Sequence, residues 1–361
     1  MKLFYKIFLL AVLVSMACLL PMYNPVGNIV FFRLVILIFI LAESTMLFKE
    51  IVVDNGKNNL IKNITTMFFS FFVLFLFLEA VFMFVPRSDG VGETYAQRLF
   101  YHKYWQPINS LGFRDREPEA DKDSAVLFVG DSFAEGWGLK FVKDRYSDIV
   151  RQQIAGSYPR YCFTNIGVSG IQPKKEFSTM TKFLDKTGKK PVKIYLQYFG
   201  NDIFDIADSM KPYRGYSPWD NLPKALKPVV KSSYLLNYIY WLIPQKGMNE
   251  FNEYLIDAYK DTACFRLHTL ELNTFVNFAK IHNAELTVIV FPFLTNTELS
   301  KTTYTDKVIQ FFNANNIKTI DVSKLVTDIP LRERIVNSND QHASVKVNRA
   351  VANEILKQIK K

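Results

Sequence analysis

The chain has little cysteine and little histidine. Three cysteines in 361 residues cannot form a disulfide framework, and four histidines leave little room for a histidine-rich metal centre. Charged residues make up 22% of the chain, against about 25% in soluble domains, and no period of about 20–50 residues recurs. These shortages exclude disulfide scaffolds and repeat arrays, and they argue against intrinsic disorder.

Charge is also absent from a long stretch near the N-terminus. No residue between Ile7 and Phe32 is charged, and apolar residues crowd into the first 86 positions. We predict three membrane spans, each close to the roughly 20 apolar residues that cross a bilayer as a helix. They lie at about 4–22, within Asn28–Phe48 and within Thr65–Val85. A soluble helical bundle is the alternative, and the lack of a polar face over 68–78 argues against it.

Basic residues flank these spans unevenly and so predict their orientation. They precede the first span or lie between the second and third: Lys2, Lys6, Lys49, Lys57 and Lys62. The tight turn expected over Pro21–Asn28 has none. Because basic segments stay in the cytoplasm, everything after Pro86 is expected on the periplasmic or extracellular side of the cytoplasmic membrane. A cleaved signal or lipoprotein peptide is the alternative for the first span and leaves that side unchanged.

Two acidic residues fall inside the predicted spans, Glu43 and Glu79. A carboxylate in an apolar span is costly, and a functional role is one explanation. The other is that each lies near an interface or pairs within the bundle, which we prefer.

After a linker and domain entry at 87–124, residues 125–361 alternate short apolar runs with helical stretches, which predicts an α/β domain with a doubly wound parallel sheet. The expected strands are Ala125–Val129, Tyr161–Ile166, Val192–Tyr198, Leu286–Phe293 and Ile317–Val322. The expected helices are Arg145–Ala155, Lys174–Lys186, Phe265–His282, Thr303–Asn315 and Ala343–Lys360.

An insertion at about 205–261 breaks this alternation. It contains five prolines and the aromatic stretch Tyr234–Ile243. A lid over the site, a surface resting on the bilayer and a second small core remain open as explanations.

Chemistry-bearing residues follow the strands, where ligands bind in open α/β sheets. The first strand runs into Gly130-Asp131-Ser132, where a serine either caps a helix or acts beside backbone N–H groups that can receive an oxyanion. The second ends near Gly167, which lets the backbone approach a ligand closely. The third ends in Gly200-Asn201-Asp202, where the asparagine either donates its amide or closes a turn.

A histidine with a nearby carboxylate lies just before the last helix. A lone histidine is more often structural than catalytic, but His342 has Asp340 two residues upstream, on an expected loop at the mouth of the sheet. A serine nucleophile needs a base and an orienting carboxylate. Ser132, His342 and Asp340 supply one of each.

In their order and placement these four blocks resemble those of the SGNH (GDSL) hydrolases. The resemblance covers about 125–360 and implies a flavodoxin-like fold, with Ser132 as nucleophile, His342 as base and Asp340 orienting it. It also implies oxyanion donors at the Ser132 N–H, the Gly167 N–H and the Asn201 side chain, with Gly130, Asp131, Gly200 and Asp202 supporting the site. Two blocks are shorter than is common in the family, since Gly200 adjoins Asn201 and one residue separates Asp340 from His342.

The segment Asn109–Asp115 resembles a lead-in of membrane-anchored members of this family. We interpret it as structural, with contact between Arg114 and substrate as the alternative. Cys162 and Cys264 are expected on the oxidising side of the membrane, where they either pair or stay as buried thiols.

The predicted function is a membrane-anchored serine esterase or O-acyltransferase, foremost for O-acetyl groups, that acts on an extracytoplasmic cell-surface glycan through an acyl-Ser132 intermediate. No cofactor or metal is expected, and a transferase would need a membrane partner as acyl donor. A lipid esterase or lysophospholipase and a non-catalytic subunit of a glycan export or modification system are the alternatives. Residues 87–361 carry a net charge of +8, which we interpret as ordinary surface charge, and no nucleic acid partner is expected.

Overall fold

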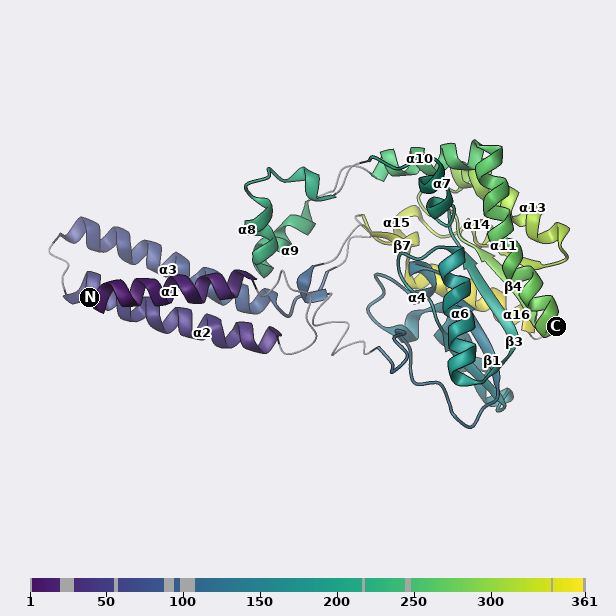
Figure 1. Cartoon of the computed structure of the whole chain (residues 1–361), viewed down its shortest axis with the longest axis horizontal. Coiled ribbons are helices and arrows are strands. Elements are labelled where there is room, and N and C mark those ends of the chain that lie inside the picture. The colour runs from purple at the N-terminus through teal and green to yellow at the C-terminus, as the bar shows by residue number, and fades with distance from the viewer. Residues whose placement is uncertain are drawn as a thin grey trace. The chain divides into compact units, whose positions relative to one another are not determined.

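The protein is described from a computed structural model (Figure 1). The structure describes residues 2–19, 29–54, 58–87, 94–97, 108–215, 218–243, 248–338 and 340–359. The turn expected over Pro21–Asn28 lies outside the described residues. Contacts divide the chain into two compact units, an N-terminal unit that also includes Pro218–Gln245 and a sheet unit with most of the rest of the chain.

Three apolar helices form the body of the N-terminal unit: α1 (Lys2–Leu19), α2 (Ile29–Phe48) and α3 (Asn59–Phe82). Among the residues that the structure describes, two helices are long and apolar enough to cross a membrane, Phe31–Val52 and Asn59–Phe82, whereas the apolar part of α1, Phe4–Leu19, is shorter. Two of the three predicted spans therefore meet the length requirement of about 20 residues, and the first remains a prediction.

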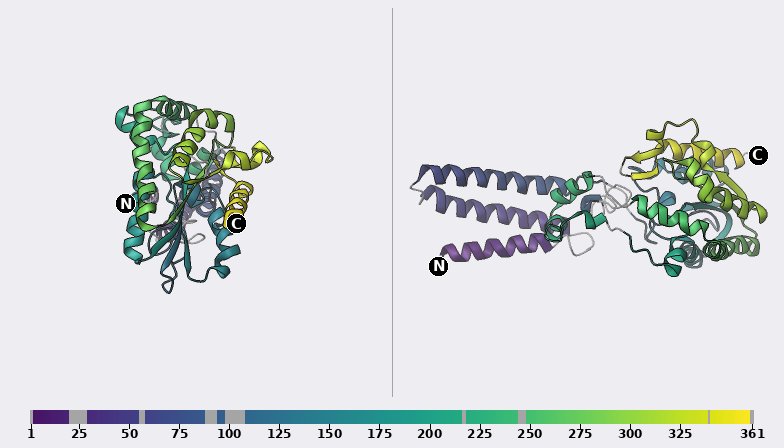
Figure 2. Two further views of the ribbon diagram at one scale, coloured as in Figure 1. Left: turned by 90° about the vertical axis from the view of Figure 1, so that its right-hand side faces the viewer. Right: turned by 90° about the horizontal axis from the view of Figure 1, so that it is seen from above.

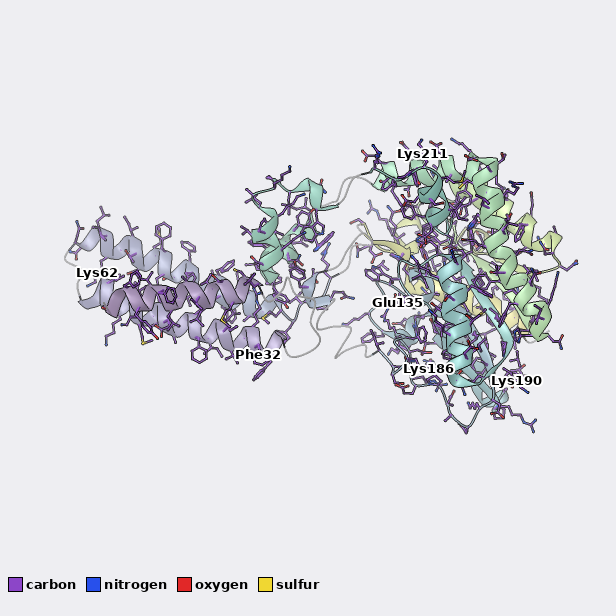
Figure 3. The ribbon with its side chains drawn as sticks, in the orientation of Figure 1. Phe32, Lys62, Glu135, Lys186, Lys190 and Lys211 are labelled. Carbon is purple, nitrogen blue, oxygen red and sulfur yellow. The ribbon has the colours of Figure 1, made fainter. Side chains whose placement is uncertain are left out.

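The three helices run in alternating directions, as their end contacts show. Lys6 near the start of α1 pairs with Glu50 beyond the end of α2 at 2.6 Å, and Arg33 near the start of α2 donates to the Ala17 carbonyl near the end of α1. Lys62 lies at the same end of this bundle as the N-terminus, and Phe32 lies at the other end (Figures 1 and 3).

Glu79 is not an isolated charge. It pairs with Arg33 at 3.0 Å, and both side chains are almost fully buried. The prediction that an acidic residue of the spans pairs within the bundle is thus correct for Glu79.

The middle of the insertion packs with these helices rather than with the sheet. It consists of a short 3₁₀ helix, η6 (Pro218–Asn221), followed by α8 (Lys227–Ser232) and α9 (Tyr234–Leu242). The Phe82 and Tyr238 rings lie 4.6 Å apart between α3 and α9. The flanking parts of the insertion, α7 (Phe204–Met210) and α10 (Met248–Lys260), belong to the sheet unit.

The sheet unit is built on five parallel strands in the order β2-β1-β3-β4-β5. They are β1 (Ser124–Val129), β2 (Tyr161–Asn165), β3 (Lys190–Tyr198), β4 (Glu285–Val290) and β5 (Lys318–Asp321). This is the doubly wound order of flavodoxin-like sheets. All five predicted strands are present, and the parallel sheet is confirmed.

Helices cover both faces of this sheet (Figure 2, left). One core joins Ala125, Leu127 and Val129 of β1 to α6 (Pro173–Thr187), α11 (Thr262–His282) and α13 (Asp306–Ala314). The other joins Val126 and Phe128 to α5 (Tyr146–Ile154) and α16 (Val345–Ile359). Alternate side chains of a strand point to opposite faces, so one apolar run serves both cores.

Short elements complete the sheet unit. They include the brief α-helices α4 (Ser132–Glu135), α12 (Thr297–Ser300), α14 (Val322–Leu325) and α15 (Leu331–Arg334). The strands β6 (Ile335–Asn337) and β7 (Asp340–Ala343) form an antiparallel pair.

Candidate active site

Ser132 begins α4, directly after the turn that follows β1. Asp131 caps α4 by accepting the Phe133 N–H at 2.9 Å, and Gly130 has φ +154°, within the region that favours glycine. Ser132 is the first residue of α4 and only 8% exposed, and its N–H donates to no residue that the structure describes. A bare N–H beside the hydroxyl is the local arrangement that receives an oxyanion.

Gln197 of β3 holds this turn in place. Its Oε1 accepts the Asp131 N–H at 3.0 Å and the Ala134 N–H at 3.2 Å, and the side chain is completely buried. A Cβ on Gly130 would lie 2.3 Å from the same oxygen, so only glycine fits there. The sequence motifs do not include Gln197, although a glutamine within the apolar run of β3 is a signal for a buried polar role.

We predict that Gln197→Leu lowers kcat on the order of 10²-fold by letting the nucleophile shift. It should also reduce the free energy of unfolding by about 1–3 kcal/mol for each buried N–H left unpaired. Urea unfolding and ester hydrolysis measure the two effects. Tyr195→Phe is the matched control on β3, because the buried Tyr195 hydroxyl has no hydrogen-bond partner among the described residues. Equal losses in both variants would contradict the role of Gln197.

Asp340 and His342 lie on β7 and not on the loop that we expected. Residues two apart on a strand point to the same face. The strand therefore explains why a single residue suffices between the carboxylate and the imidazole. Asn339, which precedes them in the sequence, lies outside the described residues.

The structure brings Ser132, His342 and Asp340 together in one hydrogen-bonded chain. The Ser132 Oγ lies 2.8 Å from His342 Nε2, and His342 Nδ1 lies 2.6 Å from Asp340 Oδ1. Asp340 Oδ1 also accepts the His342 backbone N–H at 3.1 Å, and the carboxyl group is fully buried. This is the arrangement of a nucleophile, a base and an orienting carboxylate.

Neighbouring side chains fix the position of the imidazole. The ring centroids of Phe133 and Trp137 lie 5.0 Å and 6.1 Å from that of His342. Gly138 lies so close to the carboxylate that a Cβ there would be 2.5 Å from Asp340 Oδ2, and its φ of +75° also favours glycine. Two aromatic rings thus lie against His342, and Gly138 leaves room for the Asp340 carboxylate that bonds to it.

The second block packs tightly against the nucleophile turn. The Val168 N–H donates to the Gly130 carbonyl at 3.1 Å, and the Asn165 amide donates to the Ala134 carbonyl at 2.7 Å. A Cβ on Gly167 would lie 2.4 Å from the Glu135 backbone nitrogen. The Gly167 N–H itself donates to Asn165 Oδ1 at 2.9 Å. The predicted oxyanion donor Gly167 is therefore already hydrogen-bonded within the protein, because the asparagine side chain folds back onto it.

The third block lies on the neighbouring strand end. A Cβ on Gly200 would lie 2.8 Å from the Tyr304 ring, so glycine is required for close packing. Burial raises the pKa of Asp131, and the nearby Asn201 side chain is among the groups that partly oppose this rise. Asp202 Oδ2 accepts the Phe199 N–H at 2.9 Å. Asn201 is thus placed beside the residue that precedes the nucleophile.

Three carboxyl groups close to one another are buried near Ser132, those of Asp131, Glu176 and Asp202. Burial raises the pKa of Asp131, and the Phe133 N–H partly opposes the rise. Burial and then repulsion from Asp202 raise the pKa of Glu176 well above its usual value, and neither Glu176 oxygen has a partner among the described residues. Burial and then repulsion from Asp131 do the same for the pKa of Asp202. The folded protein thus favours the protonated form of this group of acids.

The raised pKa of Glu176 predicts a pH dependence of stability. Between the reference pKa of 4.5 and the higher folded pKa, the folded state binds more protons than the unfolded state, so stability falls as pH rises. Glu176→Gln should remove this loss and raise Tm at pH 8 by about 2–4 °C for each kcal/mol relieved, with little change near pH 4. Thermal unfolding at both pH values checks this, and the exposed Glu298→Gln is the control. A stabilisation that is larger at pH 4 would contradict it.

Arg114 is structural. Its guanidinium is buried and donates to the carbonyls of Gly136 and Leu139, at 2.6 Å and 2.7 Å, in the segment after α4. Asp115 accepts from Arg151 and from the Asn165 N–H, at 3.1 Å and 2.7 Å, and so ties this segment to the second block. The interpretation of Asn109–Asp115 as a structural lead-in agrees with these contacts.

Cys162 and Cys264 are both free and buried. Among the described residues, no group of three or more His, Cys, Asp or Glu side chains could hold a metal ion.

Solved structures similar to this chain include several esterases. An acetylxylan esterase from Geobacillus stearothermophilus is 14% identical with a TM-score of 0.40, over 67% of this chain and 96% of that one. A psychrotrophic esterase from Pseudoalteromonas sp. is 13% identical with a TM-score of 0.39, over 66% and 97% of the two chains. A lipolytic G-D-S-L family protein from Veillonella parvula is 14% identical with a TM-score of 0.39, over 66% and 99%.

No family model matches the chain, and no curated protein matches it. The chain is thus similar, at 13–14% identity, to solved esterases and to a lipolytic G-D-S-L family protein.

Proposed function

We propose that the chain is a membrane-anchored serine esterase or O-acyltransferase that works through an acyl-Ser132 intermediate. The observation that carries the proposal is the hydrogen-bonded chain from the Ser132 hydroxyl through His342 to Asp340. Its geometry connects a hydroxyl to a base and the base to a buried carboxylate, which is the requirement for an activated serine.

Acylation begins when the Ser132 Oγ attacks the ester carbonyl. His342 Nε2 takes the hydroxyl proton, and the Asp340 carboxylate, which accepts from Nδ1, stabilises the resulting imidazolium. When the tetrahedral intermediate collapses, the ester C–O bond breaks and the leaving alcohol receives that proton from His342. The acyl group is then bound to Ser132 as an ester.

The oxyanion of the intermediate needs donors close to Ser132. We assign the Ser132 N–H and the Asn201 amide to this role, since the first has no partner among the described residues and the second lies beside Asp131. The Gly167 N–H can join them only if the Asn165 side chain releases it.

Deacylation determines whether the protein is a hydrolase or a transferase. In a hydrolase, His342 removes a proton from water, which attacks the acyl-serine. The ester bond to Ser132 Oγ then breaks, the acid leaves, and His342 returns the proton to Ser132. In a transferase, a sugar hydroxyl takes the place of water and leaves as the new ester. The residues of the site serve both reactions, so the acceptor that reaches Ser132 decides between them.

We further propose that this reaction takes place outside the cytoplasmic membrane on an O-acetylated cell-surface glycan. Three antiparallel spans with Lys6 and Lys62 at the cytoplasmic end would carry the sheet unit to the outer side. Ester groups in that space belong mainly to surface glycans and lipids, and a membrane anchor would hold the enzyme where glycans emerge. The positive net charge after residue 86 is compatible with an anionic glycan.

A panel of nitrophenyl esters tests the reaction, with the full-length protein in detergent. We expect acetate to be cleaved faster than octanoate or palmitate, and acetate release from an O-acetylated polysaccharide to require Ser132. Faster cleavage of long-chain esters would favour a lipid esterase. Loss of acetyl groups from the surface glycan in a deletion strain would favour a transferase, and a gain would favour an esterase. A folded protein that cleaves none of these esters would contradict the proposal.

A further inference from the structure

The segment 218–243 of the insertion is joined to the N-terminal helices by a buried polar cluster. The Glu79 carboxylate of α3 accepts the hydroxyl of Ser233 and the N–H groups of Tyr234 and Leu235, at 3.0 Å and 3.1 Å for the latter two. Glu79 therefore caps the N-terminus of α9, where a negative charge is favourable.

Arg33 completes the same cluster from α2. Besides Glu79 it donates to the Ser232 carbonyl at 2.8 Å and to the Ala17 carbonyl at the end of α1. Its guanidinium also lies 4.9 Å from the centre of the Tyr234 ring. One buried ion pair thus ties α1, α2 and α3 to the start of α9.

The cluster lies close to one end of the bundle. Glu79 precedes the end of α3 by three residues, and Arg33 follows the start of α2 by four. At 1.5 Å per residue these are distances of about 5 Å and 6 Å from the helix ends. The end in question is opposite to the Lys6–Glu50 pair. If the helices span the membrane as proposed, this end is at the outer interface and α9 begins at the level of the lipid headgroups.

The surface of 218–243 has the composition of an interfacial element. Large apolar side chains are exposed on α8, on α9 and just before α8, among them Leu226, Val229, Ile239 and Leu242. Lysines lie in the same segment at positions 224, 227 and 231. Trp219 stacks on Tyr240 at 5.1 Å between ring centres, and Lys231 lies 4.8 Å from the Trp219 ring. Exposed aliphatic side chains, tryptophan, tyrosine and lysine together are typical of helices that lie in a membrane interface.

We propose that residues 218–243 lie in the outer headgroup layer of the membrane, with their exposed apolar side chains among the acyl chains and their lysines at anionic lipid headgroups. The Arg33–Glu79 pair holds the segment at that depth. This inference rests on the proposed membrane anchor. Of the three explanations left open for the insertion, it selects the surface that rests on the bilayer over a lid or a second small core. Because the segment 218–243 is joined to three proposed membrane spans, it adjoins the lipid. Its lysines are complementary in charge to anionic headgroups.

Depth-dependent quenching tests the proposal in the full-length protein. Leu242→Cys, in a Cys18→Ala background, is labelled with an environment-sensitive fluorophore, and the protein is reconstituted in phosphatidylcholine vesicles with phosphatidylglycerol. The two remaining thiols, Cys162 and Cys264, are buried. The Cys18→Ala protein without the Leu242 substitution measures their background labelling. Labels at Phe71 on α3 and Ile281 on α11, both exposed in the structure, serve as membrane and water references.

We expect the Leu242 label to be quenched several-fold more by lipids with a shallow nitroxide than by lipids with a deep one, and the Phe71 label to show the reverse. Lys224→Gln with Lys227→Gln should weaken quenching at Leu242 in vesicles with phosphatidylglycerol and leave it unchanged in pure phosphatidylcholine. A Leu242 label that behaves like Ile281 while Phe71 is quenched would overturn the interfacial position alone. An unquenched Phe71 label would overturn the membrane anchor and the inference with it.

Discussion

Ser132→Ala is expected to lower the rate of ester hydrolysis by about 10⁴-fold or more, with only the slow contribution of binding and oxyanion stabilisation left. The reason is that the Ser132 Oγ is the atom within 2.8 Å of His342 Nε2 and the only hydroxyl that the proposed mechanism acylates. Initial rates on a nitrophenyl acetate, compared at equal concentrations of folded protein, measure the effect.

Ser169→Ala is a matched control for this variant. Ser169 lies in the second block and bonds to Glu135 through its hydroxyl and its N–H. Glu135 belongs to α4 and lies at the end of the sheet opposite to Lys190, the first residue of β3 (Figure 3). Loss of the Ser169 hydroxyl removes a contact near the site but no group that reacts, so we expect a change of less than about tenfold. A Ser132→Ala variant as active as Ser169→Ala would rule out the acyl-serine mechanism.

Asp340→Asn is expected to reduce kcat by about 10⁴-fold with little change in KM, by analogy with the same change in a serine protease triad. The Asp340 carboxylate accepts the Nδ1 proton of His342 and the His342 backbone N–H, and it is fully buried. An amide in its place can donate to Nδ1, which stabilises the tautomer with the proton on Nε2. That tautomer cannot accept the proton of Ser132.

Asp321→Asn is the comparison for the carboxylate. Asp321 ends β5 and caps α14 by accepting the Ser323 N–H at 3.1 Å, so it resembles Asp340 in type but lies outside the triad. Asparagine caps a helix about as well as aspartate, so this substitution should change stability little and leave kcat nearly unchanged. Full activity of Asp340→Asn would mean that the carboxylate does not orient the base.

The strands and the main helices of the sheet unit could be predicted because each buried strand is a short apolar run bounded by polar residues. The sequence also placed Ser132 and His342 at the correct edge, since parallel strands end together. It did not reveal that Asp340 and His342 lie on a strand. The partner β6 is only three residues long, and its apolar pattern is too brief to recognise.

The attachment of the insertion was beyond prediction for a different reason. Glu79 and Ser233 are 154 residues apart, and nothing local to α9 identifies a carboxylate on α3 as its cap. The engagement of the Gly167 N–H by Asn165 depends likewise on a side-chain rotamer that the motif does not specify. Local patterns thus predicted elements, whereas side-chain partners across the fold required the structure.

The most direct test of an activated serine is to map a fluorophosphonate adduct on the full-length protein by peptide mass spectrometry. The account predicts one adduct, on the peptide that contains Ser132, with no adduct in Ser132→Ala and strongly slowed labelling in His342→Ala. Labelling at another residue, or equal labelling of Ser132 with and without His342, would contradict the central claim that His342 activates Ser132.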